Sequence, residues 1–266
     1  MKLKKLLSLA LSLMLILFVA PMGLFSITAS AETATSGTTG DCTWTLDGTV
    51  LTISGSGSME NYTYSNSLPW GNSITEVIIK TGVAGIGDYA FSGCTGLTSI
   101  IIPDSVMSIG NGTFEDCVEL TSVNIPNSIT SINNSVFFGC KGLVNITIPD
   151  SVTIIGEDAF SGCTGLTSII IPDSVTSIGS YAFYGCRGLS SITIPNNITD
   201  IGDCTFYRCT GLTNITIGNS VTSIGKRAFS NCYNIKNIVI PKGVKSIENN
   251  TFYDCGGLEN LTLNGA

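Results

Sequence analysis

Apolar and polar positions follow a pattern that returns every 23 residues along most of this chain. A phenylalanine marks each period, and a cysteine follows it three positions later. The phenylalanines are Phe91, Phe114, Phe137, Phe160, Phe183, Phe206, Phe229 and Phe252, and the cysteines are Cys94, Cys117, Cys140, Cys163, Cys186, Cys209, Cys232 and Cys255. A fixed period in the twenties without insertions indicates a solenoid, in which each period forms one coil stacked on the next.

The first half of each period predicts a short strand and a turn. Ile100 and Ile102 lie two positions apart and precede Pro103, which predicts a parallel strand with both side chains facing inward. The sequence Pro-Asp-Ser that follows predicts a turn. Its third position holds Asn197 and Gly243 in other periods, which favours a left-handed conformation there.

The second half of each period predicts another short strand and then a helical turn. Residues 106–109 have the spacing of a short extended segment, and Gly110 ends it. Apolar residues then recur at spacings of three, as in Phe91, Cys94 and Leu97. That spacing favours a short helix or 3₁₀ turn over a strand.

The segment before the repeats predicts a cap. Residues 43–46 and 49–53 alternate around Asp47-Gly48, a dipeptide favoured in two-residue hairpins, so a β-hairpin is expected to cover the open edge of the first coil. We assign residues 32–72 to this N-terminal cap and residues 73–266 to a solenoid of about eight repeats, the last of them incomplete. The last repeat carries no polar cap, so either its open edge is tolerated or the chain is part of a longer protein.

Residues 1–31 have the composition of a secretory signal peptide. Three lysines precede an apolar run, and Pro21 and a final Ala-Ser-Ala follow it, so cleavage is expected before Glu32. An uncleaved membrane anchor is the alternative, because residues 6–24 approach the length of a membrane span. The proline and the small residues favour cleavage, and we expect no membrane insertion afterwards.

Residues 166–186, LTSIIIPDSVTSIGSYAFYGC, resemble the bacterial leucine-rich repeats of the BspA-like, or treponemal, type. The resemblance extends from about residue 73 to the C-terminus, and Trp44, Leu68 and Trp70 resemble the cap that precedes such repeats. We therefore expect an α/β, β-rich leucine-rich-repeat solenoid of 23-residue coils, with short parallel strands, short helical or 3₁₀ turns and an N-terminal β-hairpin cap. The resemblance implies a secreted or cell-surface binding and adhesion protein without catalytic residues.

The composition limits the classes of ligand and of chemistry that this protein can have. Without Lys2, Lys4 and Lys5 the chain has 9 basic and 19 acidic residues, a net charge of −10, which disfavours nucleic acid. The charge is uneven, because residues 32–186 hold two basic and fourteen acidic side chains and residues 187–266 hold seven and five. The chain has no histidine, which excludes serine-histidine and cysteine-histidine catalysis and histidine-containing zinc sites.

The ten cysteines predict buried thiols and not a disulfide framework. Side chains of stacked coils point alongside one another, a geometry that does not suit a bridge. Small buried thiols are therefore expected in the eight-membered column. Cys42 and Cys204 fall outside it, and Cys204 with Cys209 is the one local pair that could bridge.

Outward positions of the first strand form the candidate binding face. They carry hydroxyl and amide groups and almost no charge, which suits multivalent hydrogen bonding to an extracellular protein or glycan. The alternative is that these residue types simply suit exposed strands. The predicted ligand-binding residues are Asn145, Thr147, Ser168, Ser191, Thr193, Asn214, Thr216 and Asn237.

Other chemistry is weakly supported. Tyr184, Tyr207 and Tyr253 follow column phenylalanines and are candidates for a second contact strip, although tyrosines in such positions are more often scattered surface residues. Asp150 and Asp173, one period apart, are a weak cation site because asparagines interrupt their column. We find no nucleophile elbow, phosphate loop, Cys-x-x-Cys pair or calcium loop, so a monomeric protein without cofactor, metal or enzymatic activity is expected. A non-binding spacer module of a larger surface protein is the alternative function.

Overall fold

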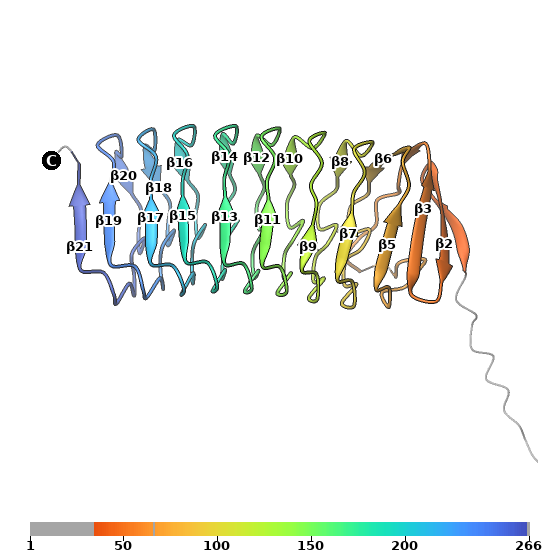
Figure 1. Ribbon diagram of the computed structural model, residues 1–266. Helices are drawn as coiled ribbons and strands as arrows, with labels where there is room; N and C mark the ends of the chain where they lie inside the picture. The colour runs from red at the N-terminus through yellow and green to blue at the C-terminus, as the bar shows by residue number, and fades with distance from the viewer. Residues whose placement is uncertain (1–34, 66, 265–266) are drawn as a thin grey trace, which may run out of the picture. The chain divides into compact units, whose positions relative to one another are not determined.

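Parallel pairing between residues 23 positions apart builds the fold. The chain divides into two units, residues 1–32 and 33–266. The computed structural model describes residues 35–65 and 67–264, all of them in the second unit, and the expected signal peptide lies outside them. In the second unit the coils stack in chain order (Figure 1).

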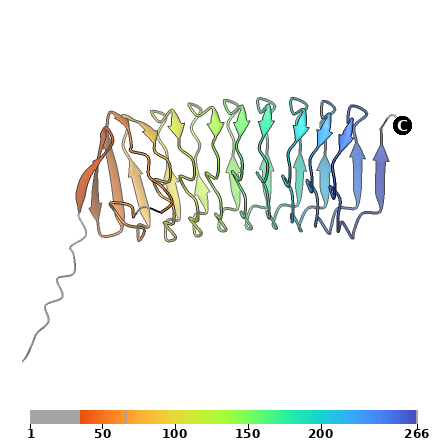
Figure 2. The same ribbon diagram turned by 180° about the vertical axis from the view of Figure 1, so that it is seen from behind.

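Each complete coil contributes one strand to each of two rows. The front row in Figure 1 contains β5 (Glu76–Ile79), β7 (Ser99–Ile101), β9 (Ser122–Val123), β11 (Asn145–Thr147), β13 (Ser168–Ile170), β15 (Ser191–Thr193), β17 (Asn214–Thr216), β19 (Asn237–Ile240) and β21 (Asn260–Leu263). The rear row, seen from behind in Figure 2, contains β6 (Val83–Ile86), β8 (Ser108–Ile109), β10 (Ser131–Ile132), β12 (Ile154–Ile155), β14 (Ser177–Ile178), β16 (Asp200–Ile201), β18 (Ser223–Ile224) and β20 (Ser246–Ile247). β11 pairs with β13 by placing Asn145 opposite Ser168, which confirms the 23-residue register.

The predicted N-terminal hairpin is confirmed. β2 (Cys42–Asp47) and β3 (Val50–Gly55) pair antiparallel around Gly48, which has a φ of 60°. β3 then pairs in parallel with β5, so the hairpin continues directly into the sheet of the coils. Two short strands that the sequence pattern did not predict, β1 (Ser36–Thr39) and β4 (Gly57–Ser58), add to β2 and β6.

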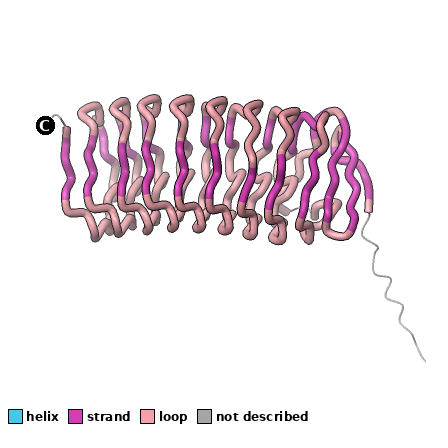
Figure 3. Tube along the Cα trace, viewed as in Figure 1, coloured by secondary structure: helices cyan, strands magenta, loops and turns pink. Residues whose placement is uncertain are grey.

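The expected short helix or 3₁₀ turn is not confirmed. The described residues contain no helix, and each rear strand is joined to the next front strand by a chain of turns (Figure 3). Turn hydrogen bonds do recur at the predicted spacing, such as Cys94 N–H to the Phe91 carbonyl at 3.1 Å. A continuous helix cannot form, because residues two positions before and two positions after each column phenylalanine adopt positive φ.

These left-handed residues form two columns. One column contains Tyr89, Gly112, Ser135, Asp158, Tyr181, Cys204, Arg227 and Asn250, and the other contains Gly93, Asp116, Gly139, Gly162, Gly185, Arg208, Asn231 and Asp254. Residues with a bulky side chain rarely adopt this conformation, because Cβ approaches the following carbonyl. The stacked geometry therefore imposes the conformation even on tyrosine and arginine.

The left-handed conformation expected at Asn197 and Gly243 is wrong, since neither residue has positive φ. This turn position serves as a hydrogen-bond donor between coils. The Ser105 hydroxyl donates to the Val83 carbonyl at 2.9 Å, and Ser174 donates to the Val152 carbonyl at 2.7 Å. Asn197 uses its side-chain amide in the same way, toward the Asp173 carbonyl.

Replacing Arg227 by glycine is expected to raise the free energy of unfolding by about 0.5–1 kcal/mol. Arg227 is exposed and has a φ of 56°, so glycine removes backbone strain without removing buried contacts. Urea denaturation of the wild type and of Arg227→Gly measures the gain. Arg227→Ala is the matched control because it removes the side chain and retains Cβ; equal stabilisation by alanine would contradict the explanation.

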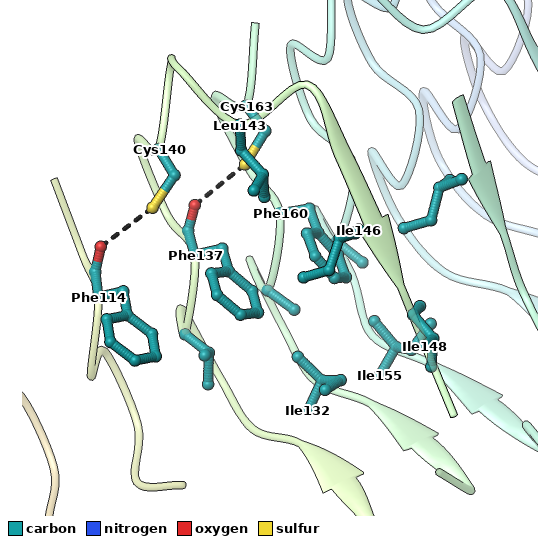
Figure 4. Packing of buried hydrophobic residues seen from close by; sticks show 14 of the residues in the cluster. Phe114, Ile132, Phe137, Cys140, Leu143, Ile146, Ile148, Ile155, Phe160 and Cys163 are labelled. Atoms are coloured by element: carbon teal, nitrogen blue, oxygen red, sulfur yellow. Dashed lines mark hydrogen bonds between the residues drawn. The ribbon is translucent and has the colours of Figure 1, made fainter. Parts of the chain in front are cut away.

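Phenylalanines and cysteines of successive coils form two parallel columns inside the solenoid. Phe137 and Phe160 stack with ring centroids 5.4 Å apart and an interplanar angle of 14°, and the stacking continues from Phe91 to Phe252. Figure 4 shows the Cys140 thiol directed at the Phe114 carbonyl and the Cys163 thiol at that of Phe137. Seven column cysteines, all but Cys94, donate in this way to the preceding coil, each at 3.1 Å. Each thiol thus serves as an inter-coil hydrogen-bond donor.

Tryptophan takes the place of phenylalanine at the N-terminal end of the aromatic column. The Trp70 ring lies 6.2 Å from Phe91, and Trp44 and Tyr62 approach Trp70 edge to face at 5.8 and 5.4 Å. Both indole rings are buried. The cap therefore ends the column with large apolar rings that cover the first phenylalanine.

Candidate binding face

The outward side chains of the front strands form one continuous surface, here called the strand face. It consists of two rows of side chains, one at the first residue of each front strand from β7 onward and one two positions later, which for β9 is the residue just after the strand. The first row is Ser99, Ser122, Asn145, Ser168, Ser191, Asn214, Asn237 and Asn260, and the second is Ile101, Asn124, Thr147, Ile170, Thr193, Thr216, Val239 and Thr262. None of these sixteen side chains is charged.

The structure brings the eight predicted residues together on this face. All are exposed, and they lie on the five neighbouring strands β11, β13, β15, β17 and β19. Pairing of Thr193 with Thr216 and of Ser191 with Asn214 places uncharged polar groups side by side on neighbouring coils. Alternation along each strand explains the placement, because the intervening isoleucines, such as Ile146 and Ile192, are buried.

The two rows differ in their hydrogen bonding. In the first row, the Ser168 hydroxyl donates to the Asn145 side chain at 3.2 Å, and the Asn260 amide donates to Asn237 at 2.7 Å. In the second row, the hydroxyls of Thr147, Thr193 and Thr216 bond to no other residue of the described chain. The threonine row therefore offers the larger unused hydrogen-bonding capacity to a ligand.

Two exposed isoleucines on the strand face are absent from the predicted set. Ile101 and Ile170 are 77% and 82% exposed, the highest values among the large apolar side chains of the described residues. Shallow hollows border Ile101 on both sides, one lined by Ile78 and Pro103 and the other by Asn124 and Thr147. The signal was present in the sequence, since both isoleucines occupy outward positions, but strand propensity alone also explains an isoleucine there.

Asn124 has a structural role that sequence reasoning missed. Its side-chain oxygen accepts the Ile102 N–H at 2.7 Å, and its amide donates to the Ile102 carbonyl at 2.8 Å. The side chain thus replaces the ladder bonds at this point, and β9 has only two residues. The front row is divided here into the sheet that ends at β9 and the pair of β11 and β13.

Of the predicted tyrosine strip, the structure brings two members together. The Tyr184 and Tyr207 rings stack at 5.3 Å with an interplanar angle of 10°, and Tyr181 lies 6.1 Å from Tyr184. Tyr253 is 64% exposed and joins no aromatic pair among the described residues.

The remaining candidates do not assemble into a site. Asp150 and Asp173 belong to no metal-binding cluster of three or more ligands in residues 35–65 and 67–264. Cys204 and Cys209 are both free thiols. The Cys209 sulfur bonds to the Phe183 carbonyl, as the register of its column requires.

The thiols of the column are strongly perturbed. Burial raises the pKa of Cys186 from an ordinary value of 9.0 to about 12. Burial likewise raises the pKa values of Cys163 and Cys209 well above 9.0. At neutral pH these groups are therefore protonated donors, and nucleophilic chemistry, which needs the thiolate, is suppressed.

The repeat geometry and its sequence define the class of protein: the chain belongs to the family of BspA-type leucine-rich repeat proteins. The model of the BspA type leucine rich repeat region matches residues 60–189 and 153–265. Comparison with curated protein sequences finds no match.

Among solved structures, the chain is similar to the leucine-rich repeat protein of T. pallidum. The two are 28% identical with a TM-score of 0.58 over 74% of this chain and 88% of the other. The pneumococcal vaccine antigen PcpA is 16% identical with a TM-score of 0.52 over 86% of this chain and 81% of the other. A leucine-rich cell surface protein of Faecalibacterium prausnitzii is 23% identical with a TM-score of 0.42, over 93% and 96%.

None of the segments in residues 35–65 and 67–264 forms a helix long and apolar enough to cross a bilayer.

Proposed function

We propose that this protein is exported and binds an extracellular protein or glycan through the strand face, without catalysis. The uncharged strand face is the observation that carries the proposal. Its sixteen outward side chains include no charged residue, although the chain has 31 formally charged side chains. Desolvating neutral hydroxyl and amide groups costs less than desolvating charges, so an extended ligand can form many hydrogen bonds at modest cost.

Rigidity supports the same function. Column stacking and inter-coil hydrogen bonds hold Thr147, Thr193 and Thr216 in fixed register on β11, β15 and β17. A pre-organised surface loses little conformational entropy on binding. Exposed Ile101 and Ile170 supply apolar contacts at two points of the same face. Export is proposed from the signal peptide expected in residues 1–31.

Charging the threonine row is expected to abolish binding. The triple variant Thr147→Glu, Thr193→Glu, Thr216→Glu places three carboxylates where the ligand would form hydrogen bonds, and a loss of at least 100-fold in affinity is expected. The affinity is measured by surface plasmon resonance with the protein beginning at Glu32. The ligands are purified extracellular-matrix proteins and neutral host and cell-wall glycans.

The matched control carries the same charge change on another surface. Thr130→Glu, Thr153→Glu, Thr176→Glu alters three exposed threonines beside the rear strands, and its affinity should stay within twofold of wild type. Equal loss in both triple variants would show a general charge effect. Absence of any binding partner would favour the spacer function.

A further inference from the structure

The turn segments between rear and front strands form a second surface whose charge changes sign along the solenoid. We call it the turn edge. Its earlier coils are acidic, with Asp88, Glu115, Asp116, Glu119, Glu157 and Asp158 against Lys141. Its part within residues 187–236 is basic, with Arg187, Arg208, Lys226, Arg227 and Lys236 against Asp203, and the last coil is acidic again, with Glu248, Asp254 and Glu259. In the earlier coils, burial and the neighbouring carboxylates of Asp116 and Asp158 raise the pKa of Glu115. Residues 187–236 of the turn edge thus present a basic surface on an otherwise acidic protein.

Two arginines of this basic segment line one hollow. Arg187, Thr210 and Tyr233 occupy the same position on three successive coils, and Arg208 lies beside them. Both guanidinium groups are exposed, and Tyr233 is 43% exposed. The hollow therefore combines two positive charges with two hydroxyl groups.

Neither guanidinium is neutralised by a carboxylate of the described chain. The single ion pair found in residues 35–65 and 67–264 joins Lys236 to Glu259 at 4.0 Å. Two carboxylates from these coils are engaged by other groups, because Asp203 accepts the Lys226 N–H at 2.7 Å and Asp254 accepts the Asn231 amide at 2.9 Å. Both arginines are therefore free of carboxylate partners among the described residues and can pair with an external anion.

Arg208 is held in place by the neighbouring tyrosines. Its guanidinium carbon lies 5.3 Å from the centroid of the Tyr207 ring, which itself stacks on Tyr184. A guanidinium held over an aromatic face loses less freedom when it binds a ligand.

The backbone at Arg208 is also unusual. Arg208 has a φ of 60°, and the equivalent residues of the other seven coils are glycine, aspartate or asparagine, which adopt this conformation more readily. An arginine at this position costs stability, and no described carboxylate pairs with it in return.

We propose that the hollow between Arg187, Arg208, Thr210 and Tyr233 binds acidic polysaccharides through their carboxylate or sulfate groups. Guanidinium groups bind such oxyanions in a bidentate manner. The hydroxyls of Thr210 and Tyr233 suit the hydroxyls of the sugar. Lining residues come from successive coils of an exposed edge, so an extended chain can lie across them. This site is separate from the strand face and does not depend on its function.

The test measures binding of heparin, hyaluronan and neutral dextran to the protein beginning at Glu32, by isothermal titration calorimetry at low and physiological salt. Hyaluronan carries carboxylates alone and heparin carries both sulfates and carboxylates, so binding of heparin alone would indicate recognition of sulfate. At least one of the two should bind, with an affinity that falls as salt rises. Arg187→Gln, Arg208→Gly is expected to weaken this binding at least tenfold. Since glycine relieves the strain at residue 208, urea denaturation of this variant should show stability at least equal to wild type, which excludes unfolding as the cause.

Lys242→Gln, Lys245→Gln is the matched control, because it removes two positive charges from elsewhere in the last coils and should change affinity less than twofold. Equal weakening by this control, equal binding of dextran, or no binding of either acidic polysaccharide would overturn the proposal. Sedimentation velocity tests whether the basic hollow instead binds the acidic part of the turn edge on a second copy of the protein. Self-association that the arginine variant abolishes, with polysaccharide binding unchanged, would also overturn it.

Discussion

Raising the pH from 8 to 10 is expected to lower the free energy of unfolding by roughly 9 kcal/mol, enough to unfold a domain of ordinary stability. Seven buried column thiols produce the effect: Cys94, Cys117, Cys140, Cys163, Cys186, Cys209 and Cys232. Burial raises the pKa of each above its ordinary value of 9.0, to about 12 for Cys94 and Cys186.

The sign follows from proton linkage. Below pH 9 the thiols are protonated in both the folded and the unfolded chain, so the stability is intact. Above pH 9 the unfolded chain loses these protons while the folded chain retains them up to about pH 12, so unfolding becomes more favourable as pH rises. Each thiol then contributes about 1.4 kcal/mol per pH unit.

Urea denaturation at pH 7 to 10 in the presence of a reductant measures this dependence. The variant Cys163→Ala, Cys186→Ala lacks two of the thiols and is the internal control. Its stability at pH 7 should be lower than that of wild type, because two inter-coil hydrogen bonds are lost. Its decline between pH 8 and 10 should be smaller by about 2.7 kcal/mol. A wild-type stability that stays constant up to pH 10 would show that the solenoid accommodates thiolates.

Phe160→Ala is expected to lower the free energy of unfolding by about 3–5 kcal/mol. Phe160 is fully buried, and its ring stacks on Phe137 and Phe183 with centroids 5.4 Å away on either side. Alanine leaves a ring-sized cavity that neighbouring coils cannot fill, because their own hydrogen-bonded register fixes the coil spacing. Equilibrium denaturation monitored by circular dichroism gives the difference.

Phe252→Ala makes the matched comparison at the end of the same column. Phe252 is only partly buried and stacks on Phe229 alone among the described residues, at 5.7 Å. The Phe252→Ala variant should lose about half as much free energy of unfolding as the Phe160→Ala variant. Equal losses at both positions would mean that stacking on two sides adds nothing to burial.

The period and the strand faces were predictable because each rests on a local rule repeated eight times. Alternation put Ile100 and Ile102 inside, and the structure confirms that both are buried. The same rule placed the predicted strand-face residues outside. The Asp47-Gly48 turn likewise predicted the hairpin, since its residue types restrict the backbone to a few conformations.

The turn segment was not predictable from spacing alone. Apolar residues three apart suit a helix, but the left-handed backbone at Tyr89 and Gly93 arises from hydrogen bonds to the next coil, such as Tyr89 N–H to the Asn111 carbonyl at 2.8 Å. The hollow around Arg187 and Arg208 was missed for a related reason. Its lining residues span three coils, and only stacking brings them together.

Because the coils are equivalent, the solenoid can become longer or shorter by whole coils. Removing residues 159–181 joins Asp158 to Ala182, and Ala182 occupies the position of Ala159 in its coil. Every column phenylalanine would still stack on the phenylalanine of the next coil. Every column thiol beyond the joint would still donate a hydrogen bond to a carbonyl of the preceding coil. A deletion or duplication whose length is not a multiple of 23 residues displaces both columns at once. Such a gene can therefore lengthen or shorten its product by unequal recombination in steps of 69 nucleotides, that is 23 codons, while folding is retained.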